Sequence, residues 1–173
     1  IKTAWGGKSL YRDFRPPGSG GEVGPYYTQM IGEVRDALTA LGDRAYRVRG
    51  FVWMQGWNDM CTEAAVPEYA DNLVNLARDV RKEFSAPDMP FVIGVMGVGG
   101  PIDPGEGGTR AVHRNFRAAM AAPAELPEFA GNVFAVPTAP FWDERLDAIS
   151  KRMDKVRNMA RMLRNKHRST PNK

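Results

Sequence analysis

Short apolar runs alternate with longer stretches of helical spacing along the whole sequence. The short runs end near glycine or proline and predict strands over residues 1–5, 46–54, 90–96 and 132–136. The longer stretches carry an apolar residue every three or four positions, and they predict helices over residues 25–41, 67–84, 109–121 and 141–166. The predicted order of elements is therefore β-α-β-α-β-α-β-α.

Strict alternation of strands and helices is typical of a parallel sheet with right-handed crossovers and a helix layer on each face. The run over residues 90–96 is apolar throughout, which predicts a strand buried on both faces. Neither an internal repeat nor a second domain is visible. We therefore expect an α/β fold, a three-layer doubly wound parallel sheet, in a single domain over residues 1–173 with a basic helix and tail from about residue 141.

Composition narrows the class of protein. The chain has 173 residues, of which 43% are hydrophobic and 25% charged, as in ordinary globular domains. No window approaches the roughly 20 apolar residues that a membrane-spanning helix needs, so no membrane partner is expected. Cys61 is the single cysteine, which excludes an internal disulfide, and no Cys/His cluster surrounds it. We therefore expect no metal site.

The net charge of +4 and the pI of about 9.4 raise nucleic-acid binding as an alternative. The cations, however, are concentrated in the last predicted helix and tail, as Lys151, Arg152, Lys155, Arg157, Arg161, Arg164, Lys166 and Arg168. A basic terminal helix is usually a solvated surface. Binding through residues 151–168 would weaken strongly with salt and would disappear with that segment, and we expect no nucleic-acid partner.

Two readings of the first loop fail on spacing. Gly7-Lys8-Ser9 matches the end of a phosphate-binding P-loop, but Lys2 stands where that pattern needs glycine, and no helix follows Ser9. Ser9 as a nucleophile would need a general base within reach. The two histidines, His113 and His167, do not follow strands, and we expect both to be exposed.

The stretch 52–59 is the strongest chemical candidate, because the strand stops at Gly56 and polar residues follow. Strand-to-helix loops of an open α/β sheet share the edge at which ligands bind. An amide two residues past a turn glycine can donate its N–H to developing negative charge. The local alternative, which spacing alone favours, is that Asn58 or Asp59 caps the next helix.

Two short blocks of this sequence resemble a known enzyme family. Gly56-Trp57-Asn58-Asp59 resembles the Gly-x-Asn-Asp block of SGNH hydrolases, and Trp53-Met54-Gln55-Gly56 resembles the Trp-His-Gln-Gly stretch of their sialate O-acetylesterase-like branch. Residues 4–10 are similar to the Gly-Gly-Thr/Ser block of the same branch. Met54 and Trp57 depart from the branch pattern, which usually has His and Glu at these positions.

The resemblance implies a flavodoxin-like fold and a carbohydrate O-acetylesterase-like hydrolase. Such an enzyme cleaves acetylated carbohydrates through an acyl-serine, without a metal or an organic cofactor. It implies that Gly7, or its neighbour Gly6, donates a backbone N–H to an oxyanion hole. By the same resemblance, Asn58 donates its side-chain amide there, and Gln55 lines the site. A periplasmic or extracellular location is implied by the family alone, and the oligomeric state stays open.

The family's Gly-x-Ser nucleophile block and its Asp-x-x-His element have no counterpart in these 173 residues, since Arg110 and Arg164 stand three residues before the histidines. We therefore expect the family's first strand and last helix to be missing, and the chain by itself to lack turnover. Asp143 is a weak candidate for the triad acid and a better one for a helix cap.

A non-catalytic carbohydrate-binding module on the same fold is the alternative function. Four tryptophans lie at or near the carboxyl ends of predicted strands, where aromatic faces can stack on sugar rings: Trp5, Trp53, Trp57 and Trp142. Tryptophan at such positions more often packs in the core. Sugar binding without release of acetate would favour the module over the esterase.

Overall fold

The computed structural model describes residues 1–168, with side chains described to residue 165. The helices are α1 (Pro25–Thr39), α2 (Trp57–Met60), α3 (Tyr69–Glu83), α4 (Gly108–Ala121) and α5 (Glu144–Arg168), and the strands are β1 (Phe51–Trp53), β2 (Phe91–Val95) and β3 (Val133–Pro137). Short 3-10 turns occur at Pro17–Ser19 (η1), Ala122–Glu125 (η2), Pro127–Phe129 (η3) and Ala139–Phe141 (η4). The predicted helices all form, within three residues of their predicted ends.

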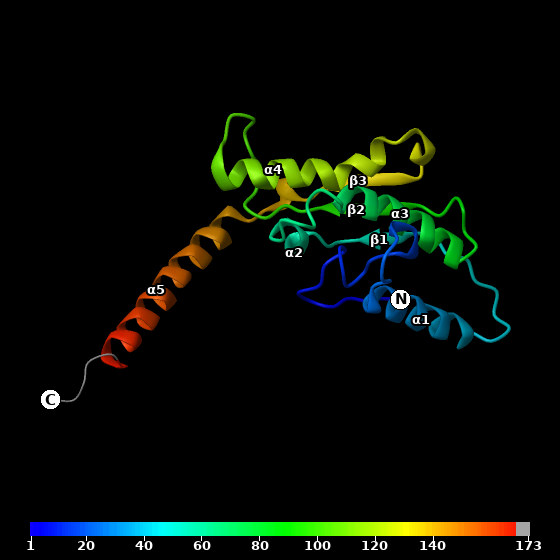
Figure 1. Ribbon diagram of the computed structural model, residues 1–173, viewed down its shortest axis with the longest axis horizontal. Coiled ribbons are helices and arrows are strands. Elements are labelled where there is room, and N and C mark those ends of the chain that lie inside the picture. The colour runs from blue at the N-terminus through cyan, green and yellow to red at the C-terminus, as the bar shows by residue number, and fades with distance from the viewer. Residues whose placement is uncertain (169–173) are drawn as a thin grey trace. The chain divides into compact units, whose positions relative to one another are not determined.

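The strands make one three-stranded parallel sheet in the order β1-β2-β3, seen side by side in Figure 1. Phe51 pairs with Phe91, which pairs in turn with Val133. A helix lies between each pair of consecutive strands, α3 before β2 and α4 before β3, as parallel pairing requires. The predicted α/β class with a parallel sheet is confirmed.

The chain divides into two compact units. The first contains residues 1–96 and 102–138, including the whole sheet, and the second contains residues 97–101 with the chain from residue 139 onward. That the two units form the single domain indicated by the sequence stays a prediction. In the second unit, the backbone N–H of Leu146 donates to the Asp143 carboxylate at 2.9 Å, so Asp143 caps α5 as expected.

The core lies on one face of the sheet. Along β2, Phe91, Ile93 and Val95 are buried, while the alternate residues are only partly buried. On β3, Phe134 and Val136 are more than 40% exposed. The prediction that β2 is buried on both faces is therefore right for one face only. Alternate side chains of a strand point to opposite faces. Because the run is apolar at every position, the sequence did not show that the two faces differ in burial.

Residues 1–5 form no strand, and neither do residues 46–50, contrary to the sequence prediction. A strand exists only where its backbone pairs with a neighbour. Residues 1–5 instead lie across a largely apolar groove of about 670 Å³ from β1, and residues 46–55 and the inner side of α1 complete its lining. Their apolar pattern is real, but no ladder partner adjoins them in the described residues.

His113 is buried, which overturns the prediction that it is exposed. It belongs to the inner stripe of α4 with Phe116 and Met120, so the helix turns its ring inward. The side chain of His167 lies outside those that the structure describes. Within residues 1–168, no helix is long and apolar enough to cross a membrane, and no group of three His, Cys, Asp or Glu side chains is placed to hold a metal ion.

Candidate functional site

Two loops that are about fifty residues apart in sequence meet at the carboxyl end of β1. The side-chain amide of Asn58 donates to the carbonyl of Gly7 at 2.5 Å. The amide of Gln55 donates to the carbonyl of Lys8 at 2.8 Å. The structure thus brings Gly7 to Gln55 and Asn58, although the first loop and the motif 53–59 lie about fifty residues apart and no local pattern predicts their contact.

Asp59 clamps the two loops together. It is fully buried, and its carboxylate accepts the backbone N–H groups of Leu10 and Tyr11, each at 2.9 Å. The Gln55 amide also donates to it, at 2.5 Å. The local alternative, a cap of the following helix, is wrong for Asp59, because the backbone N–H groups that it accepts belong to the first loop and no side chain caps α2.

The environment of Asp59 changes its proton affinity. Burial raises the pKa of the carboxyl group above its ordinary value, and the hydrogen bonds from Gln55, Leu10 and Tyr11 oppose that rise without cancelling it. A buried carboxylate with three N–H donors is a costly group that is kept in place by its partners. Asp59 therefore acts as a fixed acceptor for the first loop and has no exposed surface for a substrate.

Tyr69 holds Gln55 from the other side. This fully buried residue begins α3, and its hydroxyl donates to the backbone carbonyl of Gln55 at 2.6 Å. The same hydroxyl accepts the indole N–H of Trp53 at 3.2 Å. In the sequence, Tyr69 falls on the apolar stripe of the helix predicted over residues 67–84, which gives no sign of this contact with Gln55.

Gly7 occupies a turn that suits glycine. Its φ of +71° lies in the left-handed region, and a Cβ there would meet no heavy atom within 4 Å, so backbone conformation rather than space selects glycine. Asn58 is half-buried beside it. The side-chain amide of Asn58 carries two N–H groups, and the bond to the Gly7 carbonyl uses one of them.

The hydroxyl of Ser9 forms hydrogen bonds within its own turn. Its buried hydroxyl donates to the Asp13 carboxylate at 2.9 Å and accepts the N–H of Arg12 at 3.2 Å. Burial by itself would raise the pKa of Asp13, but the N–H and hydroxyl of Ser9, with the Lys8 ammonium at 3.6 Å, lower it below its ordinary value. The ionised Asp13 thus organises residues 9–13, and no histidine contact of Ser9 is present in the described residues.

The meeting loops border a small polar pocket of about 350 Å³. Its lining comes from the first loop and from α2 and the residues just after it: Gly7, Ser9, Tyr11, Arg12, Asp13, Asn58, Cys61 and Thr62. Two of the three predicted site residues, Gly7 and Asn58, line this pocket, whereas Gln55 lines the larger apolar groove beside β1. The pocket is concave and polar, which suits a small group with oxygen atoms.

The tryptophans divide into packed and exposed residues. Trp5 lies against Phe14 at a centroid distance of 5.9 Å, and the buried Trp53 meets the same ring edge-on at 5.3 Å. Trp57 is 48% exposed beside Asn58, and its ring meets His113 edge-on at 5.9 Å. Of the tryptophans described in this unit, Trp57 therefore offers the most accessible aromatic face near the pocket.

Comparison with known proteins gives one family and one fold. The sequence profile of the family described as "Carbohydrate esterase, sialic acid-specific acetylesterase" matches residues 1–139. No curated protein matches the chain significantly. An Arabidopsis thaliana protein solved by X-ray crystallography superposes with a TM-score of 0.53 at 18% identity, over 77% of this chain. The chain spans 45% of the length of that protein, and the similarity at this identity concerns the fold alone.

Proposed function

The chain belongs to the carbohydrate esterases of the sialic acid-specific acetylesterase family, and from that membership we propose that it supplies the oxyanion-binding loops of an acetylesterase acting on O-acetylated carbohydrates. The observation that carries this proposal is the hydrogen bond between Asn58 and Gly7. It draws together the amide and the backbone turn that would bind the oxyanion. Asp59 and Gln55 maintain that approach.

The proposed reaction is acyl transfer to a serine, followed by hydrolysis. The serine oxygen attacks the acetyl carbonyl carbon, and the carbonyl oxygen becomes an oxyanion that accepts N–H groups from Gly7 and Asn58. The base takes the serine proton during this attack. Collapse of the intermediate then breaks the ester bond, and the departing sugar oxygen takes that proton from the base and leaves as a hydroxyl. Water then releases acetate and regenerates the serine. Preorganised donors of this kind are each worth several kcal/mol in the transition state.

In this proposal the nucleophilic serine and the histidine base come from outside residues 1–173. Two observations support an external serine and histidine. The hydroxyl of Ser9 is engaged with Asp13 and Arg12, and the described ring of His113 packs against Trp57 in the core of the first unit. We therefore expect the isolated chain to bind the carbonyl oxygen of an acetyl ester without hydrolysing the ester.

The experiment measures hydrolysis of an aryl acetate and of an O-acetylated sialic acid by the full encoded polypeptide. Asn58→Ala should lower kcat about 100- to 1000-fold with little change in KM, because one oxyanion donor is lost. Asn158→Ala, which changes the same residue type on α5, is the matched control and should leave kcat unchanged. Full turnover in Asn58→Ala would refute the proposed role.

A carbohydrate-binding module is the second candidate, favoured by the exposed ring of Trp57 next to the pocket. It predicts that the full polypeptide binds the sugar, measured by calorimetry, and releases no acetate. Trp57→Ala would then abolish binding, whereas in the esterase it would mainly raise KM. Release of acetate that depends on Asn58 decides for the esterase.

A further inference from the structure

Helix α5 carries a regular stripe of apolar side chains that the proposed function does not use. Its apolar residues are separated alternately by three and four positions: Leu146, Ile149, Met153, Val156, Ala160 and Leu163. This is the a/d pattern of a coiled-coil heptad. The five larger side chains of the stripe are between 48% and 69% exposed.

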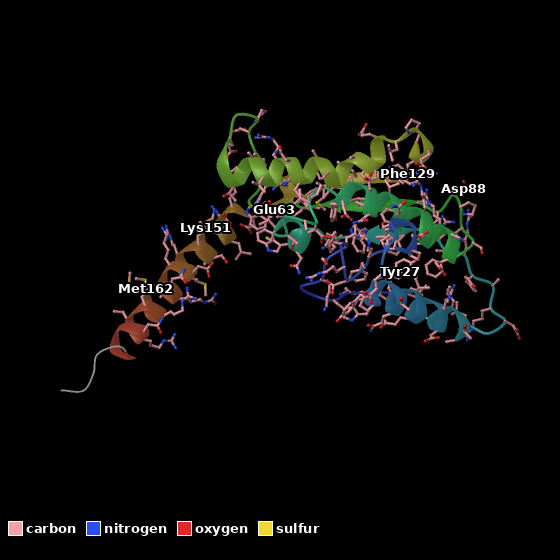
Figure 2. The ribbon with its side chains drawn as sticks, in the orientation of Figure 1. Tyr27, Glu63, Asp88, Phe129, Lys151 and Met162 are labelled. Carbon is pink, nitrogen blue, oxygen red and sulfur yellow. The ribbon has the colours of Figure 1, made fainter. Side chains whose placement is uncertain are left out.

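The stripe lies beyond the residues that match the esterase family, which end at residue 139. Most of the stability of a protein helix comes from packing its apolar face against another surface. Lys151, labelled on α5 in Figure 2, pairs its ammonium with Asp147 at 2.6 Å, four residues earlier, and neither residue belongs to the stripe. The helix therefore has the features of one member of a helix pair.

Charge decides which helix would pair with it. Six positions flank this a/d seam, named e and g, and none of them is acidic. Four are arginines, Arg145, Arg152, Arg157 and Arg164, and the other two are Ser150 and Met159. In a parallel pair of two copies, Arg152 of one chain would face Arg157 of the other, and like charges at these positions repel. The residues of the described segment 144–165 include seven Lys or Arg and three Asp or Glu. A second copy is thus a poor partner.

A lipid surface also fits less well. Helices that lie in a membrane interface have a broad apolar face that commonly includes tryptophan or phenylalanine. Residues 144–165 contain no aromatic residue. Most of their apolar side chains form a narrow seam, which is the geometry of helix–helix packing. Methionine at the seam, as at Met153, adapts to the shape of a facing helix.

We propose that α5 forms a heterotypic coiled coil with an acidic amphipathic helix of another protein. The partner helix presents apolar residues to the α5 seam and Glu or Asp to the flanking arginines. Arginine pairs with a carboxylate through two parallel hydrogen bonds, so these four residues set both the choice and the register of the partner. The interaction surface is separate from the esterase loops, and it is independent of whether those loops catalyse.

The test uses the 173-residue chain and two synthetic peptides with leucine at every a and d position. One peptide carries Glu at e and g, and the other carries Lys there. Fluorescence anisotropy should show that the Glu peptide binds at least about tenfold more tightly than the Lys peptide. Binding of the Glu peptide should weaken as salt is raised, since screening reduces the exposed charge pairs.

A charge reversal on the seam edges makes the test specific. The double variant Arg152→Glu with Arg157→Glu should reverse the preference between the two peptides. The control, Lys155→Glu with Arg161→Glu, makes the same change in net charge away from the e and g positions and should leave the preference as it was. Equal binding of both peptides by the native chain would overturn the proposal.

Three further results would also overturn it. Sedimentation of the chain alone could show a reversible dimer, which would make a second copy the partner. Vesicles containing phosphatidylserine could bind the chain more tightly than the Glu peptide does, which would make α5 a lipid-binding helix. Hydrogen exchange on the chain alone could show α5 amides as protected as those of α3, which would mean that the stripe is covered without a partner.

Discussion

Replacing Asp59 by alanine removes one buried carboxylate that joins the two loops of the site. In the native chain this group accepts the N–H of Leu10 and the N–H of Tyr11, and it also accepts the Gln55 amide. After the substitution, Gln55 still donates to the Lys8 carbonyl. The two backbone N–H groups lose their acceptor, and that of Leu10 is in a residue with no exposed surface.

The expected magnitude follows from these two bonds. A hydrogen bond to a charged acceptor contributes about 1.5 to 3 kcal/mol, which suggests about 3 to 6 kcal/mol for both. The variant also no longer buries a carboxylate, and the raised pKa of Asp59 shows that its burial is unfavourable. This relief offsets part of the loss. We expect Asp59→Ala to lower the free energy of unfolding by about 3 kcal/mol.

Two measurements check this estimate. Urea denaturation followed by tryptophan fluorescence gives the change in the free energy of unfolding. Hydrogen exchange of the amides of Leu10 and Tyr11 reports the two bonds directly, and their protection should be lost while that of α3 is kept. Asp36→Ala is the matched control, since Asp36 is exposed on α1, and it should change stability by less than about 0.5 kcal/mol.

The proposed role of Asp59 is refuted if Asp59→Ala is destabilised no more than Asp36→Ala. It is also refuted if the Leu10 and Tyr11 amides keep their protection in the variant. Either result would mean that the first loop is held by other contacts, such as the Ser9–Asp13 turn. The approach of Gly7 to Asn58 would then need another explanation.

Three further predictions concern the same region. The pKa of Asp59 is higher in the native state than in the unfolded chain, so the native state binds the carboxyl proton more tightly. The free energy of unfolding should therefore fall as the pH rises from the ordinary aspartate pKa of 3.8 through the raised pKa. Urea denaturation at several pH values gives the free energy of unfolding as a function of pH, and Asp59→Asn should flatten this fall. An unchanged slope in the variant would contradict the prediction. Tyr69→Phe removes the donor to Gln55 and should cost about 1 kcal/mol in urea denaturation, whereas Tyr46→Phe at an exposed site should cost nothing measurable. Gly24→Ala would place a Cβ at 2.3 Å from the Asp13 carbonyl oxygen and should lower the melting temperature. Gly32→Ala, on α1, would place a Cβ that meets no atom within 4 Å and should raise the melting temperature. Equal shifts in the two variants would contradict the predicted clash.

Much of the architecture was predictable because it depends on local pattern. The helices α1, α3 and α4 form where apolar residues recur at helical spacing, and β2 and β3 form where short apolar runs end at loops. Their alternation indicated a parallel sheet, which the structure confirms. The motif 53–59 was also recognisable, because its residues are adjacent and carry a family resemblance. Asp143 caps α5 through a bond to a residue three positions away, which is again local.

Long-range partners decided the rest. Residues 1–5 have the composition of a strand, yet they form none, because a strand needs a neighbouring backbone to pair with. Asp59 looked like a helix cap, and its partners proved to be Leu10 and Tyr11, almost fifty residues earlier. Helical spacing places His113 on the same face of α4 as Phe116 and Met120, but its burial depends on the surface that packs against that face. The sequence by itself determined which segments become helices and which faces they bury, since neighbouring residues set both. Only the tertiary structure decided which donor meets which acceptor, since hydrogen bonds between distant loops depend on how the whole chain packs.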